Sequence, residues 1–483
     1  MNPIDMLPTA ITENDSIAIK RSRLVFAAAL LFVASQIFTI PLYAIGPWAA
    51  WPTAPDIMSA ILLSAWILAC GWQWTVNSYS KRILWVLILL LWGMLLSLSL
   101  MTLLSAHLGW SPPTDRGSLE SALFAIGKFI HSLAMFGILA TLPWSERRGA
   151  LVRQVTSMVL LGVVFLVAMT YFEILGTDLL GSHLPSSDSI AGAWGWYNQG
   201  VLTGEGVGGV GYNHAYTALQ ILLLLAFVRQ LGPTRMSPTD YLMLVMATGG
   251  IVLSGSRAGV VGLLVYLSLS LLGSSVREKL IIGMLAGSAA AAITVWSRGR
   301  LFDLEITQRI LSLADAARGK SETLSGRDSL WNAAISAIFE SPGTLLFGHG
   351  LGRTSELLGD NAHSFLLQVW IELGAAGVLM ISSAMVGLLV VLSRTSPSNK
   401  SLLYASIAFL VTAATQETFY PVPAMGGFLV LYLSVISFSI SNTKPCSPVA
   451  SIKPSTTLDM RNSAPSIGAV VPSKQHFLFL SRD

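Results

Sequence analysis

Three residues combine a reactive side chain with a position at the edge of an apolar segment. His363 lies in NAHSFLLQVW, directly before a long apolar run, and Arg257 lies in LSGSRAG, between two apolar runs. Arg327 lies in SGRDSLW, four residues before Trp331. An imidazole is the commonest general base near neutral pH, and a guanidinium binds phosphate oxygens with paired hydrogen bonds. Together these residue types favour acid–base chemistry on a phosphate-containing substrate.

Ordinary structural roles compete with that chemistry at each position. Asn361 and Ser364 are typical helix caps, because their side chains accept hydrogen bonds from unpaired backbone N–H groups. Arg257 could extend to a lipid headgroup, and Arg327 could be one more exposed base on a polar loop. A cap does not explain the titratable ring of His363.

A polar stripe follows His363 along the same segment. Ser364, Gln368 and Glu372 are spaced four residues apart and share one face of a helix. Carboxylates inside apolar segments normally face the interior of a bundle, where an interhelical hydrogen bond and a catalytic role are both consistent with Glu372. Lys128 and His131, in another apolar segment, leave the same two alternatives open.

The chain that positions these residues is much more apolar than a soluble domain. Of its 483 residues, 53% are hydrophobic and only 11% are charged, whereas soluble domains average about 25% charged residues. Apolar runs near the length that spans a bilayer recur between short polar connections. We therefore expect an all-α polytopic membrane protein.

Twelve apolar segments are predicted to span the membrane: 24–42, 56–75, 83–104, 121–142, 154–175, 213–230, 239–253, 260–273, 279–297, 364–392, 402–417 and 425–441. With a cytoplasmic N-terminus, the inside segments hold the bases Lys20, Arg21, Arg23, Lys81, Arg82, Arg147, Arg148, Arg153, Arg229, Arg235, Arg277, Lys279, Arg394 and Lys400. The short outside loops hold two bases, Arg116 and Arg257. This alternation follows the positive-inside rule only if 239–273 crosses twice, which supports twelve spans and two cytoplasmic termini.

Residues 1–442 form the predicted transmembrane bundle. It includes a large outside loop, residues 298–363, between the ninth and tenth spans. In that loop, GRDSLWNAAISAIFESP predicts an amphipathic helix that stops at Pro342. Residues 443–483 are rich in Ser, Pro, Lys and Thr, so we expect a disordered cytoplasmic tail. The Gly-rich outside segment 176–212 matches no motif.

The order of these motifs resembles the O-antigen ligase and O-antigen polymerase superfamily. The motifs are LSGSRAG, then SGRDSLWNAAISAIFESP with GHGLG, then NAHSFLLQVWIELGAAG, and they cover residues 211–392. The resemblance implies a GT-C-like scaffold of about twelve helices in the bacterial inner membrane, with the large loop in the periplasm. It implies an inverting glycan transfer from undecaprenyl diphosphate to a sugar hydroxyl, without a metal or cofactor.

Motif positions assign roles to the three residues named first. Arg257 and Arg327 match the arginines thought to bind the donor diphosphate, and His363 matches the base for the acceptor hydroxyl. We expect further substrate contacts from Asn361, Arg353, His214 and Trp331. Ser364 follows His363 where Asn is common in the family, which puts acceptor contacts in question. The expected partners are the lipid-linked donor, a glycan or lipid A–core acceptor and the bilayer.

Two other functions fit parts of the pattern. A polymerase of O-antigen, capsule or exopolysaccharide repeat units would carry the same motifs. A transporter or flippase of lipid-linked sugars would favour paired interrupted helices in two halves, and the sequence shows no such pair. The net charge of +4 is explained by the cytoplasmic loops, so no nucleic-acid partner is expected. GEGVGG lacks a preceding strand and no Cys/His group has zinc spacing, so we predict neither a dinucleotide site nor a metal site.

Overall fold

The computed structural model describes residues 13–39, 53–70, 76, 78–103, 116–142, 145–171, 214–284, 327–359, 361–395, 399–420 and 427–441. Within these ranges the chain is helical and contains no β-strand, which confirms the predicted all-α class. Four helical stretches are long and apolar enough to cross a membrane, judged by length and composition: Ser78–Ser99, Leu119–Ala140, Glu146–Met169 and Phe365–Thr395. Shorter apolar helices accompany them.

The helices lie close to the apolar segments predicted from the sequence, except that residues 285–297 of the ninth predicted span lie outside the described residues. Their bounds are α1 Glu13–Ala34, the 3₁₀ turn η1 Ser35–Ile37, α2 Ala54–Cys70, α3 Ser78–Leu103, α4 Arg116–Ala140, α5 Glu146–Tyr171, α8 His214–Gln230, α9 Pro238–Leu253, α10 Arg257–Leu272, α13 Arg327–Ile338, α14 Pro342–Phe347, α15 Thr354–Leu358, α16 Phe365–Thr395, α17 Ser401–Thr412 and α18 Gly427–Ser441. The clearest difference is α1, which begins at Glu13, eleven residues before the first predicted span at 24–42. The number of membrane crossings stays a prediction.

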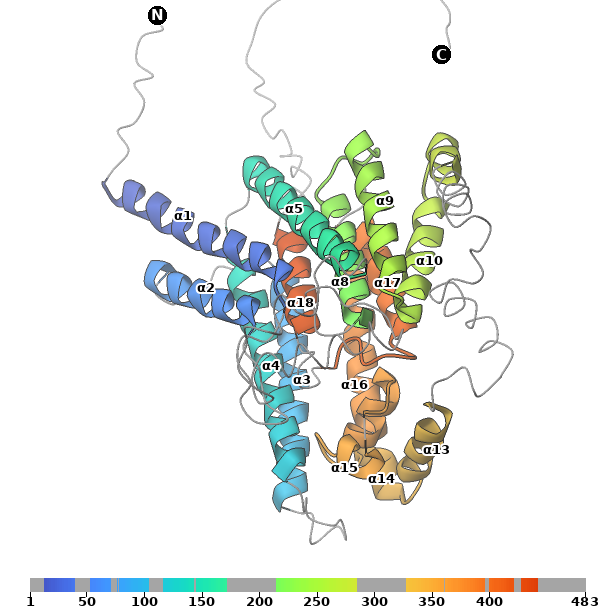
Figure 1. Cartoon of the computed structure of the whole chain (residues 1–483). Coiled ribbons are helices and arrows are strands. Elements are labelled where there is room, and N and C mark those ends of the chain that lie inside the picture. Colours follow the sequence, from blue (N-terminus) through green and yellow to red (C-terminus); the bar gives the residue numbers. More distant parts are fainter. Residues whose placement is uncertain are drawn as a thin grey trace, which may run out of the picture. The chain divides into compact units, whose positions relative to one another are not determined.

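The centre of the bundle is formed by α8 and α18, whose side chains are buried on every face. Both sequences are apolar all round, which suits helices enclosed by other helices. In Figure 1, α18 packs on α4, α5 packs on α8 and α9, α10 packs on α17, and α3 packs on α16. Short helices α13, α14 and α15 gather around the start of α16.

Helix α16 is interrupted at Gly374, where φ is +65°. The carbonyls that precede the break accept hydrogen bonds from another segment: the His349 N–H donates to Ile371 O at 2.6 Å, and the Gly350 N–H donates to Glu372 O at 3.1 Å. The predicted span 364–392 coincides closely with α16, and the break inside it arises because the GHGLG stretch supplies donors that the helix would otherwise take from its own next turn.

Glycine is required where these two segments cross. A Cβ on Gly374 would lie 2.3 Å from the carbonyl oxygen of Leu346, and a Cβ on Gly348 would lie 2.5 Å from the carbonyl carbon of Glu372. Both glycines also have positive φ, which disfavours other residues. The crossing therefore ties residues 346–350 to the first half of α16.

The predicted amphipathic helix is present as α13, but Pro342 does not stop it. Pro342 instead begins α14, where proline is favoured because the first-turn N–H groups have no helical partner. Ala334 and Ile338 of α13 are buried against Ile371 of α16, whereas Ile335 is 46% exposed. The apolar face of α13 thus packs on the first half of α16.

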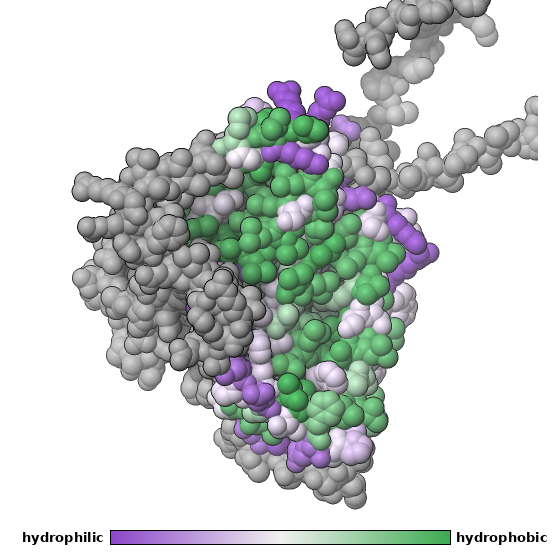
Figure 2. Space-filling model, turned by 90° about the vertical axis from the view of Figure 1, so that its right-hand side faces the viewer, coloured by the Kyte–Doolittle hydropathy of each residue, from purple (hydrophilic) through white to green (hydrophobic). Residues whose placement is uncertain are grey.

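Large apolar side chains are exposed on the outer surface of the bundle. Trp85 and Trp92 on α3 are each 66% exposed, and Leu379 on α16 is 70% exposed. Figure 2 shows a broad hydrophobic surface with hydrophilic residues toward its two ends. Exposed apolar area of this extent suits contact with lipid.

By compactness, the chain divides into residues 1–443 and residues 444–483, and every described residue belongs to the first unit. The loop 176–212, residues 298–326 and the tail lie outside the described residues.

Candidate functional site

His363 occupies the turn that leads into α16 and has a positive φ of 49°. Its neighbour Ala362 is held on both sides. The Trp331 indole N–H donates to Ala362 O at 3.0 Å, and the Ala362 N–H donates to Gln368 Oε1 at 3.0 Å. A left-handed conformation in a residue other than glycine is rare and persists where surrounding contacts impose it. These bonds fix the direction in which the His363 ring leaves the backbone.

The ring of His363 pairs with a buried carboxylate. Nδ1 lies 3.2 Å from Oε1 of Glu417, whose side chain is only 1% exposed, whereas the His363 side chain is 28% exposed. The contact is an ion pair by distance, because Glu417 Oε1 has no hydrogen-bond partner among the described residues. A neutral ring with its proton on Nδ1 keeps Nε2 as an acceptor. An imidazole oriented by a carboxylate in this way is the arrangement of a general base.

Glu417 lies in a turn that sequence reasoning placed inside a membrane span. The predicted span 402–417 was too long, since α17 ends at Thr412 and residues 413–420 form turns. The carbonyls of Ala413 and Gln416 both accept the Phe365 N–H, at 2.9 and 3.1 Å. The 413–420 turn is therefore bonded to the first residue of α16.

Arg327, the first residue of α13, contacts the same turn. Its Nη1 donates to the carbonyl oxygen of Thr415 at 2.8 Å. Thr415 precedes Glu417 by two residues, so Arg327 and His363 bind neighbouring positions of one turn. Arg327 and Thr415, which are 88 positions apart in the sequence, therefore meet at this turn. Helices α13 and α16 are also in contact.

Arg257 stands at the first position of α10, and the Ser256 hydroxyl caps the helix by accepting the Gly259 N–H at 2.9 Å. Small residues allow close packing here, as predicted: a Cβ on Gly259 would lie 2.4 Å from the Cβ of Ala218. Gly262 packs on Thr412. Arg257 lies five residues before Gly262, about 7.5 Å along the helix, at the level of the 413–420 turn.

Arg353 and Asn361 occupy different positions relative to His363 and the 413–420 turn. Arg353 is 6% exposed and its Nη2 lies 3.0 Å from Oε1 of Glu356, in a short ion pair beside α15. This placement makes Arg353 a support for the loop. Asn361 is partly exposed and lies two residues before His363.

His214 begins α8, and its side chain lies outside the described residues. Two residues later, the Tyr216 hydroxyl donates to the Glu417 carbonyl oxygen at 3.2 Å. The start of α8 therefore reaches the same turn. Trp331 uses its N–H on Ala362, so it braces the loop that carries His363.

Glu372, one member of the predicted polar stripe, is fully enclosed by hydrogen bonds. Oε1 accepts from the Thr354 hydroxyl and from Gln368 Nε2, each at 2.8 Å, and Oε2 accepts from the Tyr420 hydroxyl. These bonds join α15, α16 and the 413–420 turn. Among the two alternatives left open by the sequence, the contacts favour an interhelical role for Glu372.

Lys128 and His131 belong to a separate network between α2 and α4. Lys128 Nζ lies 2.6 Å from Asp56 Oδ1, and His131 Nε2 lies 2.7 Å from the Ser59 hydroxyl. Within the described ranges, no group of three or more His, Cys, Asp or Glu residues is placed to hold a metal ion.

An apolar groove of about 420 Å³ runs beside the site, between α3, α16 and α18. Its walls include Leu87 and Leu90 of α3 and Met380 and Ala384 of α16. Phe365, at the start of α16, also lines it. One of the residues that line the groove is therefore only two positions from His363 in the sequence.

Comparison with known proteins identifies one matching family. Residues 242–382 match a family model described as O-antigen ligase. The match begins within α9 and ends within α16, so it contains Arg257, Arg327, Arg353, Asn361 and His363, whereas Glu417 lies beyond it. No curated protein matches the chain.

Proposed function

We propose that the chain is an inverting, metal-independent membrane glycosyltransferase, because residues 242–382 match a family model described as O-antigen ligase. It transfers a glycan from undecaprenyl diphosphate to a sugar hydroxyl acceptor at the periplasmic face of the inner membrane, in lipopolysaccharide or surface polysaccharide biosynthesis. The scaffold is GT-C-like, with twelve spans, both termini in the cytoplasm and the large loop in the periplasm.

The pairing of His363 with Glu417 is the observation that carries this proposal. The acceptor hydroxyl donates its proton to Nε2 of His363 while its oxygen attacks the anomeric carbon of the donor sugar. The bond from that carbon to the diphosphate oxygen breaks, and the electron pair leaves with the diphosphate. Attack from the face opposite the leaving group inverts the anomeric configuration. Glu417 stabilises the positive charge that the ring acquires.

Arg257 and Arg327 offset the charge that grows on the leaving diphosphate. Guanidinium groups bind phosphate oxygens with short charge-assisted hydrogen bonds, which are strongest where water is excluded. Arg327 is positioned by Thr415 and Arg257 by the tip of the α9–α10 hairpin. Both lie at the level of the turn that carries Glu417, which suits a diphosphate beside the base.

The groove between α3 and α16 supports a lipid-linked donor. A polyprenyl chain has no polar groups, and the groove walls are almost entirely apolar side chains. The chain would lie in the groove with its diphosphate toward Phe365 and His363. This arrangement brings the reacting bond to the base without lifting the lipid out of the bilayer.

Single substitutions in reconstituted protein test the assignment. Arg257→Ala and Arg327→Ala should each lower glycan transfer by about 10²- to 10³-fold, because each removes a group that stabilises developing charge. Arg277→Ala, which changes an exposed base five residues beyond the end of α10, should leave transfer unchanged. Normal transfer by both Arg257→Ala and Arg327→Ala would contradict the site. Vesicles that move lipid-linked sugar across the bilayer without forming a glycosidic bond would instead identify a transporter.

The products in cells define the acceptor class. If the enzyme is a ligase, an inactive variant leaves long glycans attached to the lipid carrier. If it is a polymerase, the same variant leaves single repeat units. One gel of surface and lipid-linked glycans distinguishes the two.

A further inference from the structure

A second cavity, of about 330 Å³, lies at the opposite ends of α10 and α17 from the candidate site. It is lined by the end of α8, the 231–237 turn, the end of α10, the helical segment 276–284 and the start of α17. Helix α10 has 16 residues, so the two sites are about 24 Å apart along its axis. The predicted positive-inside topology places this end at the cytoplasmic leaflet.

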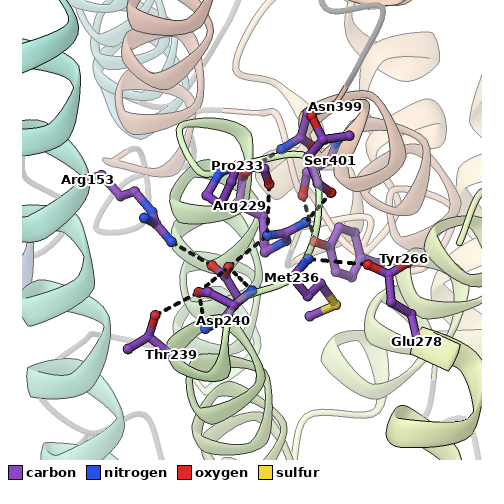
Figure 3. Close-up of polar contacts among 12 residues, drawn as sticks. Arg153, Arg229, Pro233, Met236, Thr239, Asp240, Tyr266, Glu278, Asn399 and Ser401 are labelled. Atoms are coloured by element: carbon purple, nitrogen blue, oxygen red, sulfur yellow. Dashed lines mark hydrogen bonds and ion pairs between the residues drawn. The ribbon is translucent and has the colours of Figure 1, made fainter. Parts of the chain in front are cut away.

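One wall of the cavity carries excess positive charge. Arg229 Nη1 lies 3.0 Å from Oδ2 of Asp240, and Arg153 Nη2 lies 2.8 Å from Oδ1 of the same carboxylate. Figure 3 shows the two guanidiniums converging on Asp240 from different helices. Two cations share one anion, so one positive charge is not balanced within this group. Arg229 also lines the cavity, and so does the exposed Lys400.

The facing wall carries a carboxylate. Glu278 lines the cavity and accepts hydrogen bonds from the Met236 N–H at 3.3 Å and the Ser275 N–H at 3.0 Å. Figure 3 shows Glu278 beside Tyr266, whose hydroxyl lies 2.6 Å from that of Ser401. The cavity therefore presents both signs of charge, together with hydroxyl groups.

Apolar side chains complete the lining and continue outside. Leu225, Leu244, Leu267 and Ile282 are among the lining residues. Leu272 and Val276, close in sequence to the lining residues Gly273 and Ser274, are 78% and 73% exposed, as expected for residues that face lipid chains. A ligand for this cavity needs a zwitterionic head and apolar chains.

We propose that the cavity binds a zwitterionic phospholipid of the cytoplasmic leaflet, with an ethanolamine-type head group. Its phosphate contacts Arg229 and Lys400, its ammonium contacts Glu278, and its acyl chains lie over Leu272 and Val276. An anionic lipid such as phosphatidylglycerol offers the same phosphate to Arg229 and Lys400 but no cation to Glu278. The site is separate from the proposed glycosyl transfer and does not depend on it.

Native mass spectrometry of the purified full-length protein tests the proposal. The probes are phosphatidylethanolamine, phosphatidylglycerol and inorganic phosphate, each added to delipidated protein. We expect wild type to retain phosphatidylethanolamine about two- to fivefold better than phosphatidylglycerol, as one favourable charge contact implies. Glu278→Gln should remove this preference, and Lys400→Gln should weaken both lipids.

Two further variants complete the design. Ser270→Trp fills the cavity and should abolish retention of either lipid, whereas Arg394→Gln, a basic residue outside the cavity lining, should change nothing. Melting curves in detergent show whether each variant is folded, and the two charge variants remain informative if Ser270→Trp is not. Equal retention of both lipids by wild type, or retention unaffected by Glu278→Gln and Lys400→Gln, would overturn the proposal. Competition by inorganic phosphate alone would identify a free phosphate site instead.

Discussion

Two buried carboxylates, one at each end of the bundle, show how differently the same group is used. Asp240 is fully buried and holds Arg153 and Arg229, and it also completes a capping box with Ser237. Glu417 is almost as buried, but its ion-pair partner is His363, a titratable ring that remains 28% exposed.

The two carboxylates differ in the kind of side chain with which each forms an ion pair. Asp240 pairs with guanidiniums, which stay charged at every physiological pH, so its contacts are permanent. Glu417 pairs with an imidazole, which gains and loses a proton near neutral pH. One carboxylate fastens helices together, and the other supports a group that can change charge during a reaction. The predictions below test this division, from the largest expected effect to the smallest.

Removing the imidazole should have the largest effect. His363→Ala should lower glycan transfer by about 10²- to 10⁴-fold, because a positioned general base contributes that much to the rate. The measurement is transfer from lipid-linked donor by purified protein at matched folded concentration. His349→Gln is the matched control: its ring bonds the Ala337 carbonyl at 3.0 Å near the same end, and transfer should stay within a few-fold of wild type. A His363→Ala variant with wild-type rates would remove the base from the mechanism.

Changing the carboxylate that orients the ring should have a smaller effect. Glu417→Gln should lower transfer by about 10- to 100-fold, the usual effect of losing a partner that orients a reactive group. The acidic limb of the pH–rate profile should also move to lower pH, because the amide no longer stabilises the protonated ring. A purely structural Glu417 would change the amount of folded protein and leave the profile in place.

At the opposite end, the same change should affect stability alone. Asp240→Asn leaves two guanidiniums without their counter-ion and should reduce the free energy of unfolding by about 1–3 kcal/mol. Thermal unfolding in detergent measures the loss. Transfer per folded molecule should remain within about twofold of wild type. A drop in rate comparable to that of Glu417→Gln would show that the two carboxylates are not functionally distinct.

Blocking the apolar groove should separate binding from chemistry at the site. Ala384→Trp places a large ring in the groove and should raise KM for the lipid-linked donor about tenfold with little change in kcat. Steady-state kinetics with varied donor concentration measure both constants. If kcat falls instead while KM holds, the groove does not bind the donor lipid.

Much of the fold was predictable because hydropathy alone locates long apolar helices. The bounds of α9 and α10 agree with the predicted hairpin around SGSRAG to within a few residues. The break in α16 was not predictable in the same way. A glycine inside an apolar run is compatible with a helix, and Gly374 breaks this one only because Gly348 and its neighbours approach from another segment.

The site was predictable in part for a similar reason. His363 and Arg327 stand out as reactive side chains at polar–apolar junctions, whereas Glu417 was counted inside the predicted span 402–417. The polar run of Thr415, Gln416 and Glu417 directly after an apolar segment was the available signal. It places a carboxylate at the same predicted membrane level as His363. Their meeting depends on the turn that ends α17, which a count of apolar residues does not reveal.

The break in α16 has a consequence for how a substrate enters. Ile371 and Glu372 direct their carbonyls to the His349 and Gly350 amides rather than to the helix itself. Lifting the 349–350 segment away would strand two carbonyls in a candidate membrane-spanning helix, at a cost of several kcal/mol each. We therefore expect residues 349–350 to stay in place when a substrate binds. Entry from the side, within the plane of the bilayer and along the groove between α3 and α16, leaves those bonds intact.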